Sequence, residues 1–232
     1  MKNLIILILL MVFNANIYSQ ENVVKVDYVT YSTKFPEVVE DNCHLYLTDS
    51  KSQFVFLQQE RDYRVNNYLI TPHFIKYISN YHYKQQEVED NRTLKDSTIL
   101  YSRWKNDIVW EIHDDTKEIL GYKVQKATTD SFDTEKDDFF YKGKAIAWFT
   151  SEIPIPSGPT RYYGLPGLIL EVQFEKSNNV WTAKNIDFNS SYTFKEFNKE
   201  NEVTKNDVVY FFHENPKKIK EIQKQNKKKL KK

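Results

Sequence analysis

Cysteine is nearly absent from this chain, because Cys43 is the only one among its 232 residues. No disulfide can form within the chain, so in an oxidising compartment its stability has to come from packing. A membrane-spanning helix needs about 20 apolar residues in a row, and beyond Ser19 the sequence has no apolar run of that length. It contains no nucleophile elbow, phosphate-binding loop or dinucleotide fingerprint, so the common motifs of hydrolases, NTPases and nucleotide-dependent oxidoreductases are missing.

The first 19 residues have the pattern of a secretory signal peptide. Lys2 supplies the charged start, an apolar run extends from Leu4 to Phe13, and a polar stretch ends at Ser19. The run has ten residues, so a cleaved signal is favoured over a retained membrane anchor. No cysteine lies near the expected cut to accept a lipid. We therefore expect residues 1–19 to be removed and the remaining chain to be exported, to the periplasm or the extracellular space.

Charge is distributed unevenly along the chain. Residues 217–232 hold nine lysines and one glutamate. The whole chain carries +1, of which residues 1–19 hold +1 and the tail +8, so residues 20–216 carry −8. Pro216 suits the first position of a helix, and the sequence predicts a basic C-terminal helix or tail. Its simplest role is a solvated end; the alternative is weak contact with an anionic membrane or with the acidic body of a neighbouring molecule.

The composition favours a mainly β fold. Aromatic residues make up 15% of the chain and β-branched residues are plentiful, which suits half-buried strands better than helices. Short strand-like segments follow one another without the amphipathic helices that parallel crossovers need. We therefore expect one antiparallel β domain over residues 20–216, with a strongly curved sheet that forms a half-barrel, barrel or sandwich, followed by the short C-terminal helix.

Individual strands are predicted from alternating apolar residues and from turn residues between them. Two hairpins are expected, one turning at residues 113–117 and one at Lys142-Gly143. In the segment 168–174 the residues Leu168, Leu170, Val172 and Phe174 are expected to share one buried face. The other predicted strands cover residues 23–33, 53–58, 68–70, 74–78, 98–104, 108–112, 119–127, 138–141, 144–150, 180–188 and 207–213.

Glycine and proline concentrate in one segment. All five glycines lie between Gly121 and Gly167, and four of the seven prolines lie between Pro154 and Pro166. Residues 153–167, hereafter the motif loop, cannot form a regular helix or a central strand because proline fixes φ and removes a hydrogen-bond donor. A connection of this length inside a compact domain is commonly functional or disordered, and the aromatic residues around it favour order.

The motif loop also carries a family resemblance. Residues 164–169 read Gly-Leu-Pro-Gly-Leu-Ile, and the flanking segments 116–122, 126–127, 147–150, 153–155 and 158–159 fit the same pattern. Over residues 110–172 the chain thus resembles the GLPGLI family of exported Bacteroidota proteins, which has no assigned activity. The resemblance implies an envelope or secreted location and transfers no catalytic residue. Val124 is a departure, because similar members often carry cysteine there.

Two interpretations of the motif loop remain open. In the structural one, the loop plugs or caps one end of the curved sheet, and Gly164 and Gly167 bracket a tight turn that leads into the strand after it. The residues that carry this role are Gly158, Pro159, Gly164, Leu165, Pro166 and Gly167. In the functional one, the loop walls a pocket or forms a docking rim. Its ligand or partner contacts would then be Trp148, Phe149, Arg161, Tyr162 and Tyr163.

Chemistry-bearing residues form no recognised constellation. The pairs and triplets Cys43-His44, His113-Asp114-Asp115 and His213-Glu214 lack the spacing of zinc ligands, so no metal and no cofactor is predicted. Glu152 and Glu171 flank the motif loop and are the one candidate pair of carboxylates for acid and base catalysis. A nucleic-acid partner is not expected, because the aromatic body is acidic and the basic tail has no aromatic residue.

The sequence thus favours a non-catalytic envelope protein that binds an apolar or peptide ligand in a curved β-sheet. Two alternatives remain. In the first, the chain is an interaction protein that docks on another envelope component through the motif loop. In the second, it is a hydrolase that uses Glu152 and Glu171.

Overall fold

The computed structural model describes residues 22–33, 35–57, 63–65, 68–70, 74–130, 144–174, 179–209 and 216–231. The predicted signal peptide, the predicted strand at residues 138–141 and the predicted hairpin turn at Lys142-Gly143 lie outside these ranges, as does His213. Neither helix in the described ranges is long and apolar enough to cross a lipid bilayer.

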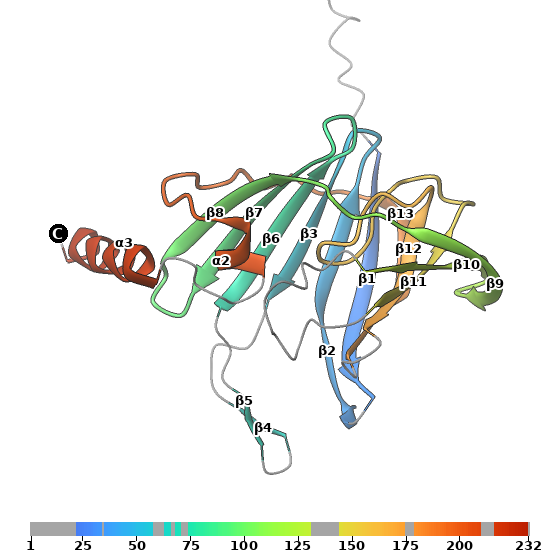
Figure 1. Cartoon of the computed structure of the whole chain (residues 1–232), viewed down its shortest axis with the longest axis horizontal. Coiled ribbons are helices and arrows are strands. Elements are labelled where there is room, and N and C mark those ends of the chain that lie inside the picture. The colour runs from blue at the N-terminus through green and yellow to red at the C-terminus, as the bar shows by residue number, and fades with distance from the viewer. Residues whose placement is uncertain are drawn as a thin grey trace, which may run out of the picture.

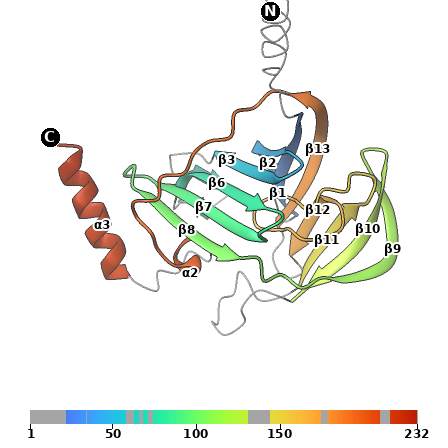
Figure 2. The ribbon, with the colours of Figure 1, turned by 90° about the horizontal axis from the view of Figure 1, so that it is seen from above.

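The fold is mostly β, with one antiparallel sheet of eleven strands that is not closed (Figure 1). Seen from above, the sheet is bent rather than flat (Figure 2). Among the predicted alternatives this leaves the half-barrel. The strand order is β8-β7-β6-β3-β2-β1-β13-β12-β11-β10-β9. The strands are β1 (Val23–Ser32), β2 (Phe35–Leu47), β3 (Lys51–Leu57), β6 (Phe74–His82), β7 (Glu87–Leu94), β8 (Ile99–Lys105), β9 (Glu111–Ile119), β10 (Tyr122–Thr129), β11 (Ala145–Thr150), β12 (Leu168–Phe174) and β13 (Asn179–Ser190).

Smaller elements complete the fold. The strands β4 (Tyr63–Val65) and β5 (Tyr68–Ile70) form a separate two-stranded hairpin. After β13 come the helices α2 (Lys205–Val209) and α3 (Pro216–Lys229). The predicted basic C-terminal helix is confirmed by α3, which lies beside the β8 end of the sheet (Figure 2).

The predicted strand at residues 207–213 is wrong at its start, because residues 205–209 are helical. Thr204 and Asp207 explain the helix. The Asp207 backbone N–H donates to Thr204 Oγ1 at 3.2 Å, and the Thr204 backbone N–H donates to Asp207 Oδ2 at 3.1 Å. This reciprocal pair is a capping box, which starts a helix one residue after the threonine.

The first predicted hairpin turn is also misplaced. The turn lies at Leu120-Gly121, where both residues have positive φ, and Ile119 pairs directly with Tyr122. Two residues of positive φ form the two-residue turn that matches the twist of a hairpin. His113 and its two neighbouring aspartates belong to β9 instead. Because β9 is the last strand of the sheet, charged side chains there face water and protect an open edge.

The alternation predicted for β12 is interrupted at Leu170. Phe149 on β11 pairs with Ile169, but Trp148 pairs with Glu171, so Leu170 is an extra residue in the ladder. This bulge shifts the phase of the strand. Ile169 and Val172 therefore share one buried cluster, while Leu168 and Leu170 pack in another. The prediction that Leu168, Leu170 and Val172 share one face is wrong.

A long segment after β13 crosses one face of the sheet on its way to α2 (Figure 2). It is fastened by buried amide side chains of the strands beneath it. Gln53 on β3 donates to the carbonyl of Lys195, and Asn91 on β7 donates to the carbonyl of Asn198. At the edge, the Tyr101 N–H donates to Asn201 O at 3.0 Å, so the segment adds a short parallel bridge to β8.

Glu89 is the charged anchor of this crossing segment. Its Oε1 accepts from Lys199 Nζ at 2.6 Å and from the Tyr101 hydroxyl at 2.8 Å, and its Oε2 lies 3.1 Å from His82 Nε2. Burial alone would raise the pKa of Glu89, but these hydrogen bonds outweigh burial and lower the pKa to about 2. The ordinary value is 4.5, so the carboxylate stabilises the fold above pH 4.5.

We expect Glu89→Gln to lower the free energy of unfolding by about 2 kcal/mol at pH 7, because it removes a buried acceptor of charge-assisted hydrogen bonds. The deficit should shrink as the pH falls from 4.5 toward 2, since wild-type Glu89 becomes protonated over that range. Urea unfolding of wild type and Glu89→Gln across this pH range measures the difference in free energy of unfolding. A deficit that does not change with pH would show that the charge of Glu89 has no part in stability.

Candidate functional site

The motif loop lies against the sheet and is tied to it by hydrogen bonds of its backbone. The Leu168 N–H on β12 donates to Ile153 O at 3.0 Å and the Ile169 N–H donates to Ser157 O at 2.9 Å. The Ser157 hydroxyl donates to Ser52 Oγ on β3 at 2.7 Å, and both serines are buried. The loop therefore spans from β12 to β3 in the other half of the sheet.

Glycine is required at three positions of the motif for two different reasons. A Cβ on Gly158 would lie 2.7 Å from Ile169 Cβ, and one on Gly167 would lie 2.1 Å from Thr150 O. Both distances are far below van der Waals contact, so only glycine permits this approach. Gly164 instead has φ +89, which strains any residue with a Cβ. Leu165 beside it is buried against Phe149, whereas Pro166 is exposed.

The structure separates the predicted contact residues into four environments. Phe149 and Tyr162 pack in one buried cluster. Tyr163 is buried elsewhere, stacked on Tyr81 with ring centroids 4.4 Å apart, and its hydroxyl lies 2.9 Å from Ser79 Oγ. Trp148 is half-buried and points to the other face of β11 from Phe149, because adjacent strand residues alternate. Arg161 is half-buried in the motif loop.

The two candidate catalytic carboxylates have different partners. Glu171 Oε1 accepts from Lys117 Nζ at 2.7 Å, and the same ammonium lies 4.4 Å from the Trp148 ring centroid. Glu152 is exposed and its Oε1 accepts from the Lys123 N–H at 3.1 Å. Their use as an acid and base pair stays a hypothesis. Two of the histidines whose spacing did not fit a zinc site have partners within the protein: His113 Nε2 lies 2.8 Å from Thr128 Oγ1, and His44 Nδ1 lies 2.6 Å from Asp27 Oδ1.

A buried row of polar residues crosses β6, β7 and β8, and we call Ser79, Asp90 and Ser102 the polar row. Ser79 pairs with Asp90, and Asp90 pairs with Ser102, so all three project from the same face of the sheet. Tyr163 of the motif loop covers this face through its contact with Ser79. Asp90 and Ser102 are both 0% exposed.

The polar row is satisfied only in part by the described protein. Arg92 Nη2 lies 3.3 Å from Asp90 Oδ2, and Ser79 and Tyr77 also hydrogen-bond the Asp90 carboxyl. Asp90 Oδ1 and Ser102 Oγ have no hydrogen-bond partner in the described part of the chain. Burial raises the pKa of Asp90, and the Arg92 charge together with these hydrogen bonds offsets only part of this effect. Arg92 also lies over the Tyr77 ring, 3.4 Å from its centroid. A buried carboxylate oxygen and a buried hydroxyl without partners indicate a place where a further polar group belongs.

Sequence reasoning missed this row because β7 was not predicted. The segment 87–94 reads Glu-Val-Glu-Asp-Asn-Arg-Thr-Leu, which has too few apolar residues for a strand signal. Val88, Asp90 and Arg92 point inward together, which the buried neighbours on β6 and β8 make visible only in the fold.

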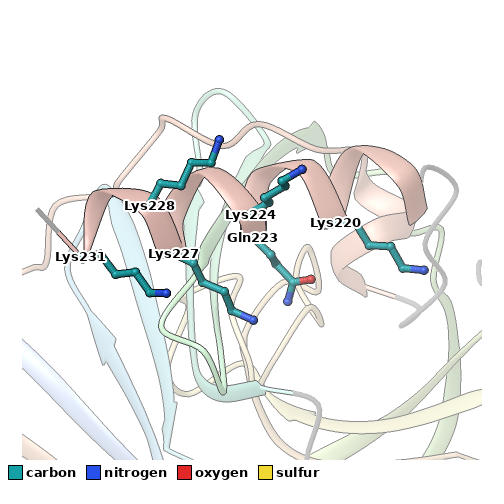
Figure 3. Close-up of a pocket in the computed structure, with 6 residues that line it drawn as sticks. All are labelled: Lys220, Gln223, Lys224, Lys227, Lys228 and Lys231. Atoms are coloured by element: carbon teal, nitrogen blue, oxygen red, sulfur yellow. The ribbon is translucent and has the colours of Figure 1, made fainter.

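A concave feature runs along α3 (Figure 3). An open cleft of about 340 Å³ lies between the side chains of the helix. Its lining is polar and almost wholly basic: Lys220, Gln223, Lys224, Lys227, Lys228 and Lys231. Within the described residues no group of three or more His, Cys, Asp or Glu side chains gathers in a way that would hold a metal ion.

Comparison with known proteins gives a partial family match and a fold. Residues 133–171 match the model of a family described as Protein of unknown function (Porph_ging), and this stretch includes the motif loop. No curated protein has a sequence that matches this chain.

Two solved structures of PNGF-II, in space groups C2 and P21, superpose with a TM-score of 0.54 at 16% and 17% identity. The match covers 82% of this chain in both cases but only 32% and 33% of theirs, so this chain spans about a third of their length. A DUF1329 family protein from Desulfovibrio piger matches at a TM-score of 0.32 and 8% identity, over 79% of this chain and 91% of that one. The chain is thus a mostly β protein that shares its fold with part of PNGF-II and a short stretch of sequence with a family of unknown function.

Proposed function

We propose that this chain is an exported, non-catalytic binding protein of the GLPGLI type, which holds an apolar or peptide ligand against the β6–β8 part of its curved sheet. Because Asp90 and Ser102 are 0% exposed, the ligand enters only when the side chains that cover this face, such as Tyr163, move aside, and it then places a hydrogen-bond donor between Asp90 Oδ1 and Ser102 Oγ. The single observation that carries the proposal is that both atoms are buried and unpaired within the described residues.

The energetics of burial support a ligand there. A buried polar atom without a partner costs about 1–3 kcal/mol, and a carboxylate oxygen costs more than a neutral one. Two such atoms on directly paired residues therefore favour a group that donates to the carboxylate and bonds the hydroxyl. A peptide N–H, an amine or a hydroxyl has this chemistry.

The surroundings of the polar row support an apolar body for the ligand. On one side, Tyr81, Val88 and Tyr163 form a buried cluster against which Trp104 packs. On the other side, Tyr77 and Leu100 occupy the next row of the same face. Aromatic and aliphatic walls with one or two placed polar groups are typical of binding sites for small organic molecules.

The two alternatives have less support. Docking through the motif loop would use its exposed residues, yet Phe149, Tyr162 and Tyr163 are buried by the protein itself. A hydrolase would need Glu152 and Glu171 to act on the same substrate bond. Each carboxylate instead accepts a hydrogen bond from a different strand, Glu171 from Lys117 on β9 and Glu152 from Lys123 on β10. The export proposal rests on residues 1–19, and the mass of the protein isolated from its own cells tests it directly. Cleavage after Ser19 would leave residues 20–232.

We expect native mass spectrometry of the protein, purified gently from the cells that make it, to find a discrete added mass that unfolding releases. Asp90→Asn should lower the occupied fraction at least about tenfold, because the amide offers one acceptor fewer and no charge to a donor. Ser52→Ala is the matched control, since it removes a buried hydroxyl of the same sheet that has its own partner, Ser157.

Ser102→Ala distinguishes a ligand-binding site from a protein core that simply contains unpaired polar atoms. Without ligand, this variant should be about 1 kcal/mol more stable than wild type, because it removes a buried hydroxyl that has no partner. Its occupied fraction should nevertheless fall. An unmodified mass for wild type, or equal occupancy in wild type and both polar-row variants, would overturn the proposal.

A further inference from the structure

The rotation of α3 about its own axis is fixed by contacts with the sheet. Ile219 is buried with Leu100 and Val203, and Ile222 packs against the same cluster. One turn further on, Asn226 Nδ2 donates to Thr98 Oγ1 at 3.4 Å. The apolar side of the helix is therefore used by the protein itself, and the remaining sides face away from the cluster.

Four lysines start from neighbouring positions on those remaining sides. Lys220, Lys224, Lys227 and Lys231 follow one another at spacings of four, three and four residues, which places them on one stripe of a helix. We call them the lysine stripe. In Figure 3 the side chain of Lys224 points upward and those of Lys220, Lys227 and Lys231 point downward. At a rise of 1.5 Å per residue the stripe is about 16 Å long, with a charge about every 5 Å.

The lysine stripe has no acidic partner in the described part of the chain. Among the α3 lysines, Lys229 is the one with an ion pair in that part, to Glu200 at 3.3 Å, and it is not in the stripe. The four ammonium groups repel one another along the cleft of about 340 Å³ that they line. This arrangement costs free energy in the isolated protein and is relieved by a bound anion.

We propose that the lysine stripe binds a linear anionic polysaccharide, a chain that carries one carboxylate or sulfate per sugar in a row. Positive charges that follow one another along the helix axis match a linear polyanion. A bilayer is a poorer partner, because the apolar residues that would insert, Ile219 and Ile222, already pack on the sheet. Single-stranded nucleic acid is poorer too, since no aromatic side chain lies on α3 to stack with bases. The proposal does not depend on a ligand at the polar row.

The test is fluorescence anisotropy with labelled heparin and labelled alginate, at low salt and at physiological salt. We expect the purified wild-type protein to bind, more weakly at higher salt. Changing all four stripe lysines to glutamine should lower affinity about 100-fold or more, because each lysine near an anionic surface contributes about fivefold. These side chains are exposed at the helix surface or line the open cleft, so the variant should melt at the wild-type temperature.

The matched control changes four exposed lysines elsewhere, Lys84, Lys95, Lys123 and Lys144, and alters net charge by the same amount. It should lower affinity by less than about threefold. Equal losses in the two variants would mean that net charge alone attracts the polyanion, and the proposal would be wrong. It would also be overturned if wild type bound vesicles of phosphatidylcholine and phosphatidylglycerol, or oligo-dT, more tightly than both polysaccharides.

Discussion

Gly167→Ala should leave little or no folded protein. The added Cβ would lie 2.1 Å from the carbonyl oxygen of Thr150 and 2.7 Å from its carbonyl carbon. Both are backbone atoms, so no side-chain rotation relieves the contact. Thr150 pairs with Leu168, and relief would require this pairing at the end of β11 and β12 to open. We expect a loss of at least about 4 kcal/mol, a large share of the 5–15 kcal/mol that holds an ordinary domain together.

Gly121→Ala is the matched control for this prediction. Gly121 lies in the β9–β10 turn with φ +81, and nothing lies within 4 Å of the Cβ that alanine would add. Its cost should be about 1 kcal/mol, from backbone strain alone. Soluble yield and urea unfolding followed by circular dichroism compare the two variants. A Gly167→Ala protein within about 1 kcal/mol of wild type would mean that the motif does not need this close approach.

Gln53→Leu should destabilise the protein by about 3–5 kcal/mol and detach the segment after β13 from the sheet. Gln53 is 0% exposed and makes four hydrogen bonds. Its Nε2 donates to Asn80 Oδ1 at 2.7 Å and to Lys195 O at 3.0 Å. Its Oε1 accepts from the Tyr192 hydroxyl at 2.5 Å and from the Lys195 N–H at 3.0 Å. Leucine has a similar volume but leaves every one of these partners unpaired.

Hydrogen exchange locates this effect. The amide protons of Lys195 and Asn198 should exchange faster in Gln53→Leu than the global loss of stability explains, because the crossing segment opens separately. Gln125→Leu provides the comparison, since Gln125 is half-buried and donates to the carbonyl of His113 at 2.8 Å. Its effect should stay near 1 kcal/mol. Exchange that rises uniformly over the whole sheet would show that Gln53 holds no separate unit in place.

The fold class and the motif loop were predictable because their signals are local. Proline and glycine in residues 153–167 exclude regular structure whatever surrounds them, and the basic C-terminal helix begins at Pro216 as expected. The alternation of apolar and polar residues in residues 168–174 predicts the strand β12. Its bulge at Leu170 was not, because an extra residue shows only in the pairing of Ile169 and Glu171 with β11.

The rest depended on tertiary context. In β9 the residues His113 and Asp114 look like a turn in sequence, but they suit an edge strand that no further described strand covers. Asp90 reads as a surface residue, yet the pairing of β7 between β6 and β8 buries it completely. No local sequence pattern predicts that this carboxylate is buried. Thr204 and Asp207 are the opposite case, since their capping-box spacing predicts the start of α2 and was overlooked.

The most direct test of the proposed function is a near-atomic-resolution crystal structure of the protein purified from its own cells. The proposal predicts continuous density for a non-water molecule at the polar row, with a donor atom 2.6–3.2 Å from Asp90 Oδ1 and within hydrogen-bond distance of Ser102 Oγ. A single isolated water between the two atoms, or a Ser102 hydroxyl that turns to bond the protein and leaves no added density, would contradict it.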